Sequence, residues 1–128
     1  MMIVYQDTLL RILLFLVLIN IGHSCCTGKV TSMTVTGSTA GSTVWGTNPY
    51  TDDSDMGRAA VHAGVLTNGQ SGAITLTVVG SLASFSGSTA NGVTTSSYGG
   101  WCGVQLTGGS STPADPCAAP PPPPPPPP

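Results

Sequence analysis

The sequence predicts an α+β fold in which β-strands predominate and a single helix is enclosed by them. Two observations predict it. The middle of the chain is rich in Thr, Ser, Gly and Val, with turn-forming residues about every eight to twelve positions, a pattern typical of short antiparallel strands. One segment departs from it and repeats small apolar residues at helical spacing. Charged residues make up 6% of the 128 positions and the formal net charge is −2, which excludes coiled coils and a basic nucleic-acid-binding surface.

The N-terminus, residues 1–24, is predicted to be a secretory signal peptide. Arg11 precedes an apolar run over residues 12–19, and the small residues of 22–24 offer a cleavage site before Cys25. An uncleaved membrane anchor is the alternative. The apolar run is shorter than the roughly 20 residues that a membrane-spanning helix needs, so we expect no stable membrane span after cleavage, and a secreted product.

Four cysteines lie outside this leader, namely Cys25, Cys26, Cys102 and Cys117. An exported chain is expected to pair them. A bond between the adjacent Cys25 and Cys26 would strain the backbone, so each of these two is predicted to join either Cys102 or Cys117, and both arrangements remain open. A zinc site is disfavoured because the chain has no C-x-x-C spacing.

Three segments alternate clearly enough to predict strands: 29–36, 73–79 and 101–106. In the sharpest of them, Ile74, Leu76 and Val78 point to one side and threonines to the other. Shorter strands are expected at 44–45, around Phe85 and at 93–97. Asn68-Gly69 and Asn91-Gly92 are predicted turns with positive φ.

The predicted helix spans residues 51–64. Thr51 or Asp52 would cap its first turn, and Gly64 would follow its last turn as the C′ residue. A narrow apolar face is formed by Met56, Ala59, Ala60 and Ala63. Because alanine side chains are short, strands are expected to pack closely around this helix.

The helix segment and its surroundings resemble a known extracellular family. Val44-Trp45-Gly46-Thr47, Tyr50-Thr51-Asp52-Asp53-Ser54 and Ala59-Ala60-Val61-His62-Ala63-Gly64 are similar to the signature of the LCCL domain, and the stretches 86–93 and 97–101 agree with it. The resemblance covers about 44–106. It implies a central helix wrapped by two antiparallel β-sheets in a domain that we place at residues 25–107. It also makes Ser54, Ala59, Ala60, His62 and Gly64 structural motif residues.

One position departs from the family pattern. The family's cysteine before Ala-Ala falls on Gly57, so the family's disulfide cannot form here and its pairings cannot be transferred. The resemblance implies a non-catalytic binding module, with lipopolysaccharide, another glycan, lipid or extracellular matrix as partner.

The residues themselves argue against catalysis. Ser54 and Asp55 lie eight and seven residues before His62, about two helical turns away, and no Gly-x-Ser-x-Gly motif is present. We therefore predict no enzymatic activity, and a His62 that is hydrogen-bonded to backbone near the helix end. Asp52, Asp53 and Asp55 are weak candidates for a metal site, but helix capping explains them better. No cofactor is expected.

Four aromatic residues are candidates for ligand binding: Trp45, Tyr50, Tyr98 and Trp101. Such rings can stack on sugars or insert into lipid, although core packing is the default role for aromatic side chains. Residues 108–119 are predicted to be a flexible linker. Residues 120–128 are nine consecutive prolines, which predict a rigid polyproline II tract.

The sequence therefore predicts a secreted, non-catalytic LCCL-type binding or adhesion module. The alternative is a structural matrix or cell-wall component whose proline-rich spacer is hydroxylated and glycosylated. A secreted enzyme is the weakest hypothesis. No nucleic-acid partner is expected, and the sequence leaves the ligand and the oligomeric state open.

Overall fold

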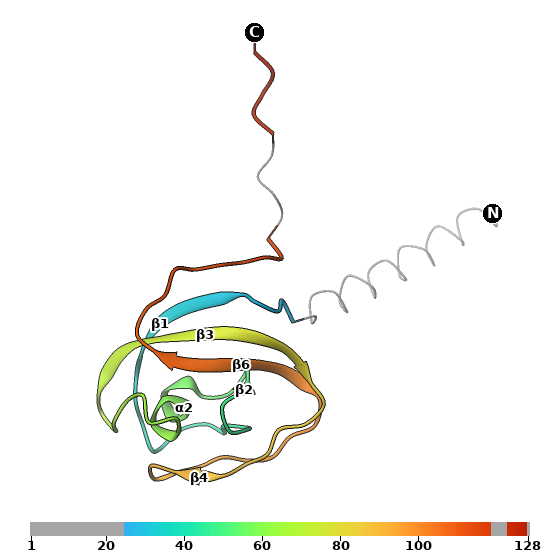
Figure 1. The fold of residues 1–128 in the computed structure, drawn as a ribbon. Helices are drawn as coiled ribbons and strands as arrows, with labels where there is room; N and C mark the ends of the chain where they lie inside the picture. The colour runs from blue at the N-terminus through green and yellow to red at the C-terminus, as the bar shows by residue number, and fades with distance from the viewer. Residues whose placement is uncertain (1–24, 119–122, 128) are drawn as a thin grey trace, which may run out of the picture.

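The computed structural model describes residues 25–118 and 123–127, so the predicted signal peptide lies outside the described residues (Figure 1). The elements are β1 (Val30–Thr36), β2 (Tyr50–Thr51), α2 (Met56–His62), β3 (Ser71–Leu82), β4 (Thr89–Ala90), β5 (Val93–Thr94) and β6 (Trp101–Gly108). Among the described residues, no helix has the length and apolar character that crossing a membrane requires.

A four-stranded antiparallel sheet, in the order β1-β3-β6-β2, forms the larger part of the fold. Its two faces differ as the alternation in β3 predicts. Ile74 is fully buried and Leu76 packs against the same core, whereas on the opposite face the Thr75 hydroxyl lies 3.1 Å from that of Ser32. The three strands predicted with most clarity are thus confirmed, and β3 continues three residues beyond its predicted end.

The second sheet is small. It is the hairpin of β4 and β5, whose two-residue turn is Asn91-Gly92. Both turn residues have positive φ, 53° and 79°, as the sequence predicts for a turn of this type. The expected strands at 44–45 and around Phe85 are instead isolated bridges, from Trp45 to Ser96 and from Phe85 to Tyr98.

The helix is shorter than predicted. It begins at Met56, and its N-cap is Asp55, whose carboxylate accepts the backbone N–H of Arg58. The prediction of Thr51 or Asp52 as cap is wrong because Thr51 pairs with Gly103 as part of β2, which commits the chain to an extended conformation. Gly64 does follow the helix with a φ of 77°, as expected of a C′ glycine.

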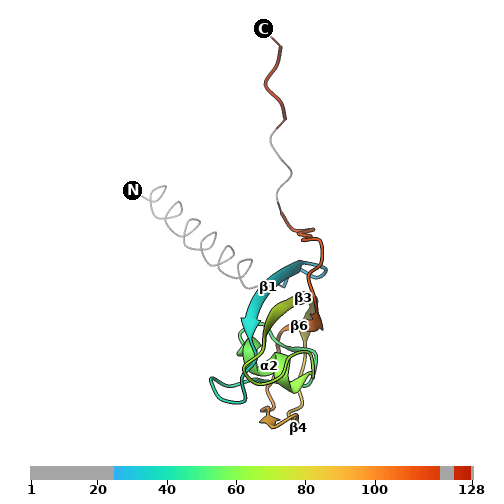
Figure 2. The same cartoon turned by 90° about the vertical axis from the view of Figure 1, so that its left-hand side faces the viewer.

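The expected apolar face of this helix is buried, because Met56 and Ala63 pack against the core that contains Ala59 and Ala60, but the buried surface is wider than predicted. Ala59 and Ala60 are fully buried, and Val61 and His62 are only 3% and 4% exposed. Figures 1 and 2 show α2 between the four-stranded sheet and the β4–β5 hairpin. A helix with protein on both sides buries more than one stripe of its surface.

The picture of one helix wrapped by two sheets therefore holds only loosely. The protein is mostly β, with one short helix and two antiparallel sheets in its described part. The smaller sheet has just two residues in each strand. Much of the layer opposite the large sheet is therefore loop rather than sheet.

The segment predicted to be a flexible linker is attached to the domain. β6 extends to Gly108, and the chain then pairs with the edge of β1, where Val30 and Ala114 exchange two backbone hydrogen bonds of 2.8 and 3.2 Å. Ser111 donates its N–H to the Ser32 hydroxyl. No periodicity in the sequence marks these contacts, and for that reason the sequence predicts a linker in this stretch. Pro123–127 are exposed and lie in neither helix nor strand.

Candidate functional site

The LCCL-like signature residues meet inside the protein around His62. The Nδ1 atom of His62 lies 2.8 Å from the hydroxyl of Tyr50, and its Nε2 atom lies 3.0 Å from the hydroxyl of Ser88. The Asn91 side chain donates to the backbone carbonyl of His62 at 3.0 Å. His62 thus ties α2 to β2 on one side and to the β4–β5 hairpin on the other. Its partners are side chains, so the prediction of a backbone-bonded ring is wrong.

Burial sets the protonation state of this pair. It raises the pKa of Tyr50 to about 12, so the phenol stays neutral. It also lowers the pKa of His62. A neutral imidazole has one donor and one acceptor nitrogen, and two hydroxyl partners satisfy both.

The arrangement also bears on catalysis, because Ser88 and His62 are within the distance of a nucleophile and its base. The group that orients the imidazole is a neutral phenol, however, and supplies no negative charge to stabilise an imidazolium. His62 is only 4% exposed, and the Ser88 hydroxyl also lies 2.6 Å from that of Thr47. These features suit a structural hydrogen-bond network. Sequence reasoning included Ser88 in a stretch that agrees with the family but missed its contact with His62, because the two residues lie 26 positions apart.

Ser54 forms a second buried contact of the signature. Its hydroxyl accepts the backbone N–H of Trp45 at 3.0 Å and lies 2.8 Å from the Thr51 hydroxyl. These bonds fix the loop before the helix. Together with the buried Ala59 and Ala60, they show that the motif residues build the interior.

The three aspartates do not gather into a metal site. Asp55 accepts the N–H groups of Arg58 and Ser42, and Asp52 accepts the indole N–H of Trp101 at 2.7 Å. Asp53 is exposed. Over residues 25–118 and 123–127, the one acidic or sulfur cluster with metal-like spacing is Cys26, Asp115 and Cys117, and both of its sulfurs belong to a disulfide.

The four candidate aromatic residues separate into two groups. Tyr50 is fully buried, so its prediction as a binding residue is wrong: its ring fills the core and its hydroxyl holds His62. The other three lie next to one another and form what we call the exposed aromatic surface: the half-buried Trp45, Tyr98 and Trp101. Ring centroids lie 5.7 Å apart from Trp45 to Tyr98 and 6.0 Å from Tyr98 to Trp101. Tyr98 is 45% and Trp101 39% exposed.

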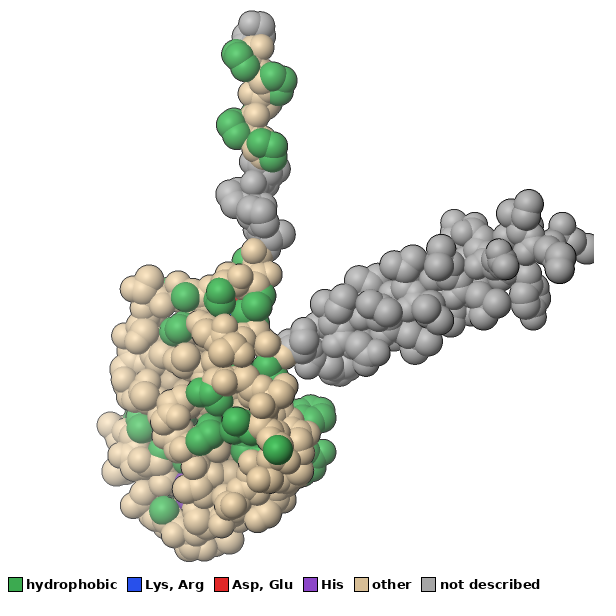
Figure 3. Space-filling model, turned by 45° about the vertical axis from the view of Figure 1, so that its right-hand side comes forward, with side chains coloured by type: hydrophobic (Ala, Val, Ile, Leu, Met, Phe, Trp, Pro, Cys, Tyr) green, Lys and Arg blue, Asp and Glu red, His purple; other side chains and the backbone are tan. Residues whose placement is uncertain are grey.

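A groove of about 820 Å³ begins at this surface. Trp101, Asp52 and Leu82 contribute to its lining on one side, and Cys25, Cys26 and Lys29 also line it. The hydrogen bond to Asp52 holds the indole of Trp101 in place. Figure 3 shows one face of the protein, on which apolar side chains lie in small groups among polar and backbone atoms. The groove combines the ring of Trp101 with polar groups, as ligand sites commonly do.

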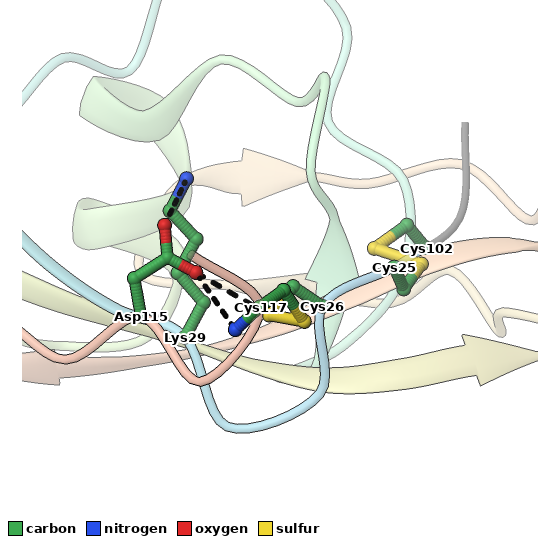
Figure 4. The surroundings of a disulfide bond; sticks show 6 residues. All are labelled: Cys25, Cys26, Lys29, Cys102, Asp115 and Cys117. Carbon is green, nitrogen blue, oxygen red and sulfur yellow. Dashed lines mark hydrogen bonds and ion pairs between the residues drawn. A yellow bond between two sulfur atoms is a disulfide. The ribbon is translucent and has the colours of Figure 1, made fainter. Parts of the chain in front are cut away.

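Two disulfides lie beside the groove, Cys25–Cys102 and Cys26–Cys117 (Figure 4). The prediction that Cys25 and Cys26 each join one of the distant cysteines is confirmed. An ion pair of 3.8 Å between Lys29 and Asp115 supports the same region, and Asp115 also accepts the backbone N–H of Cys117. The two ends of the domain are therefore linked covalently at one place.

The fold and the site define a small, disulfide-linked, mostly β domain of the kind that serves extracellular proteins. The model of the LCCL domain matches residues 21–103, well over half of the chain. The chain belongs to the LCCL domain family. As a family, LCCL domains are extracellular binding modules. No match was found among curated proteins or among solved structures.

Proposed function

We propose that this protein is a secreted, non-catalytic module that binds a glycan through the exposed aromatic surface and the adjoining groove. The observation that carries the proposal is the grouping of Trp45, Tyr98 and Trp101 at the surface. Two of these rings are more than a third exposed, although aromatic residues make up only 5% of the chain. Exposed aromatic side chains grouped in this way suit a binding role.

The chemistry around the rings favours a sugar. Ring faces can stack on the C–H groups of a pyranose, and the Asp52 carboxylate beside Trp101 can accept hydrogen bonds from sugar hydroxyls. An anionic lipid surface would require a cluster of basic side chains. The domain has only Lys29 and Arg58, and Lys29 is already paired with Asp115. A neutral saccharide, including the outer polysaccharide of lipopolysaccharide, fits this surface best.

The proposal can be tested with the protein's own fluorescence. Both tryptophans of the chain, Trp45 and Trp101, belong to the exposed aromatic surface, so their emission reports on it alone. Titration of the secreted protein with lipopolysaccharide should change this emission saturably, and Tyr98→Ala should weaken binding at least tenfold. Met33→Ala is the matched control, because Met33 is 41% exposed but lies on β1.

Phosphatidylcholine vesicles provide the comparison for lipid. A saturable response to lipopolysaccharide without a response to vesicles would support sugar recognition. Equal binding by Tyr98→Ala and the unmodified protein, or no saturable response at all, would contradict the proposal.

Secretion needs its own test. Mass spectrometry of the protein from culture medium should give a first residue at Cys25, because cleavage is expected after Ser24. The same spectra would show whether the prolines are hydroxylated, as a matrix or cell-wall role would require.

A further inference from the structure

A second ligand for the exposed aromatic surface is carried by the chain itself. Residues 120–128 are nine consecutive prolines, and such sequences form the extended polyproline II helix. We propose that the exposed aromatic surface of one molecule binds the polyproline tract of a second copy of this chain. The inference goes beyond glycan recognition and does not depend on it.

The rings lie close enough together for one face of a proline tract to contact more than one of them. The ring centroids lie 5.7 Å apart from Trp45 to Tyr98 and 6.0 Å apart from Tyr98 to Trp101. A polyproline II helix has three residues per turn and rises about 3.1 Å per residue, so prolines on one of its faces recur about every 9.3 Å. The rings of each pair are inclined at 58° and 86°. Rings at these distances and angles pack edge to face against one another and present a continuous aromatic surface, and aromatic-lined grooves are the usual receptors of polyproline II segments.

Hydrogen bonding between the two parts is also complementary. A proline tract has no N–H groups and offers only carbonyl acceptors. The surface offers donors: within the described chain the Tyr98 hydroxyl has no hydrogen-bond partner, and the neighbouring Gly99 and Gly100 are exposed outside any strand. The Trp101 indole N–H is held by Asp52, which fixes the ring without covering its exposed part. Neither the tract nor the three rings carry charge.

The structure favours a second copy as the source of the tract. Pro123–127 are exposed, so in this structure they do not occupy the rings of their own domain. The start of the tail is held by the disulfide from Cys117 to Cys26. Because the tract and its receptor are different surfaces, the contact is heterologous, and association need not stop at a dimer.

The test compares the secreted chain with a version that ends at Ala119, which keeps all four cysteines. Sedimentation equilibrium from about 10 μM to 1 mM should show an average mass that rises with concentration for the full chain. The shortened chain should remain monomeric. A synthetic nine-proline peptide added to the shortened chain should change tryptophan emission saturably. Tyr98→Ala should weaken that response at least tenfold, while Met33→Ala should leave it unchanged.

Three results would overturn the inference. The first is a full chain that stays monomeric at every concentration, whether or not deletion of its tract changes the tryptophan emission. The second is a shortened chain that associates as strongly as the full one. The third is a peptide that binds Tyr98→Ala and the unmodified surface equally. Lipopolysaccharide binding that persists when the peptide fails to bind would reject this inference while leaving glycan recognition intact.

Discussion

The region around α2 and the region around the chain ends are stabilised in different ways. Around α2, fully buried alanines and the hydrogen bonds of His62 hold the helix between the sheet and the hairpin. At the chain ends, two disulfides join Cys25 and Cys26 to distant parts of the sequence, and the neighbouring aromatic rings are exposed. The first region is fixed by packing and the second by covalent bonds.

This difference explains where the family signature lies. Its tyrosine, serine, alanines and histidine are the residues that build the packed region, so the signature identifies the fold. The exposed aromatic surface lies beside the covalently linked region, where side chains that we propose to bind ligand need not take part in the core. The family signature therefore contributes both to the packed interior and, through Trp45 and the stretch 97–101, to the exposed aromatic surface.

The largest expected effect comes from the covalent region. The disulfides close loops of 77 and 91 residues, and links across loops of this length stabilise a protein by about 2–5 kcal/mol each, mainly by restricting the unfolded chain. Replacing Cys26 and Cys117 together with Ser should lower the free energy of unfolding by that amount in urea denaturation. An unchanged denaturation midpoint would show that packing alone holds the chain ends.

In the packed region, Tyr50→Phe should have the next largest effect. The change keeps the ring but leaves the Nδ1 atom of buried His62 without its partner, which should lower the free energy of unfolding by about 1–3 kcal/mol. Tyr98→Phe is the matched control, because the Tyr98 hydroxyl has no partner within the described chain. Its effect should stay within about 0.5 kcal/mol. Equal effects of the two variants would remove the distinction between the regions.

Gly57→Ala tests how closely the helix approaches β1. A Cβ atom at Gly57 would lie 2.5 Å from the backbone carbonyl oxygen of Thr36, so the backbone must move. Overpacking of this kind costs about 1–3 kcal/mol, whereas Ala gains about 1 kcal/mol in helix propensity. We expect a net loss of about 1 kcal/mol in thermal or urea unfolding.

Gly99→Ala is the control for Gly57→Ala, since an added Cβ there meets nothing within 4 Å. It should leave stability unchanged. A stabilised Gly57→Ala variant would mean that the helix and β1 are less tightly packed than the structure shows.

The smallest effect concerns pH. Burial lowers the pKa of His62 in the folded protein below the value of about 6.5 expected in the unfolded chain. The unfolded chain then binds a proton that the folded chain does not. The stabilisation is therefore complete above about pH 6.5 and decreases as the pH falls from there toward the folded-state pKa, by at most about 1.4 kcal/mol per pH unit.

Urea midpoints between pH 7.5 and 5 would measure this decrease, and His62→Gln should reduce the slope. Stability that rises on acidification, or an equal slope in His62→Gln, would contradict the assignment.

The sequence predicts the strands better than the ends of the helix. The alternation of Ile74, Leu76 and Val78 is a local pattern, and the structure follows it. The helix starts at Met56 because Tyr50 and Thr51 pair with β6, and that pairing with residues about 50 positions away leaves no local signal. The attachment of Ala114 to Val30 was hidden for the same reason.

The candidate site was predicted in part. The four cysteines restrict their pairing to two arrangements because neighbouring residues do not bond to each other, and one of these two is observed. The four aromatic residues could not be sorted by sequence, since burial depends on the whole fold: Tyr50 is in the core and Tyr98 is exposed. The contact of Ser88 with His62 could not be found, because it arises only when the hairpin folds against α2.

The central claim is that the buried signature residues around His62 hold the fold while the exposed aromatic surface binds ligand. It is tested most directly by measuring both the free energy of unfolding and lipopolysaccharide binding in Tyr50→Phe and Tyr98→Ala. We predict that Tyr50→Phe loses about 1–3 kcal/mol of stability and keeps its affinity, whereas Tyr98→Ala keeps its stability and loses affinity at least tenfold. Weakened binding by a fully folded Tyr50→Phe protein, with unchanged binding by Tyr98→Ala, would contradict it.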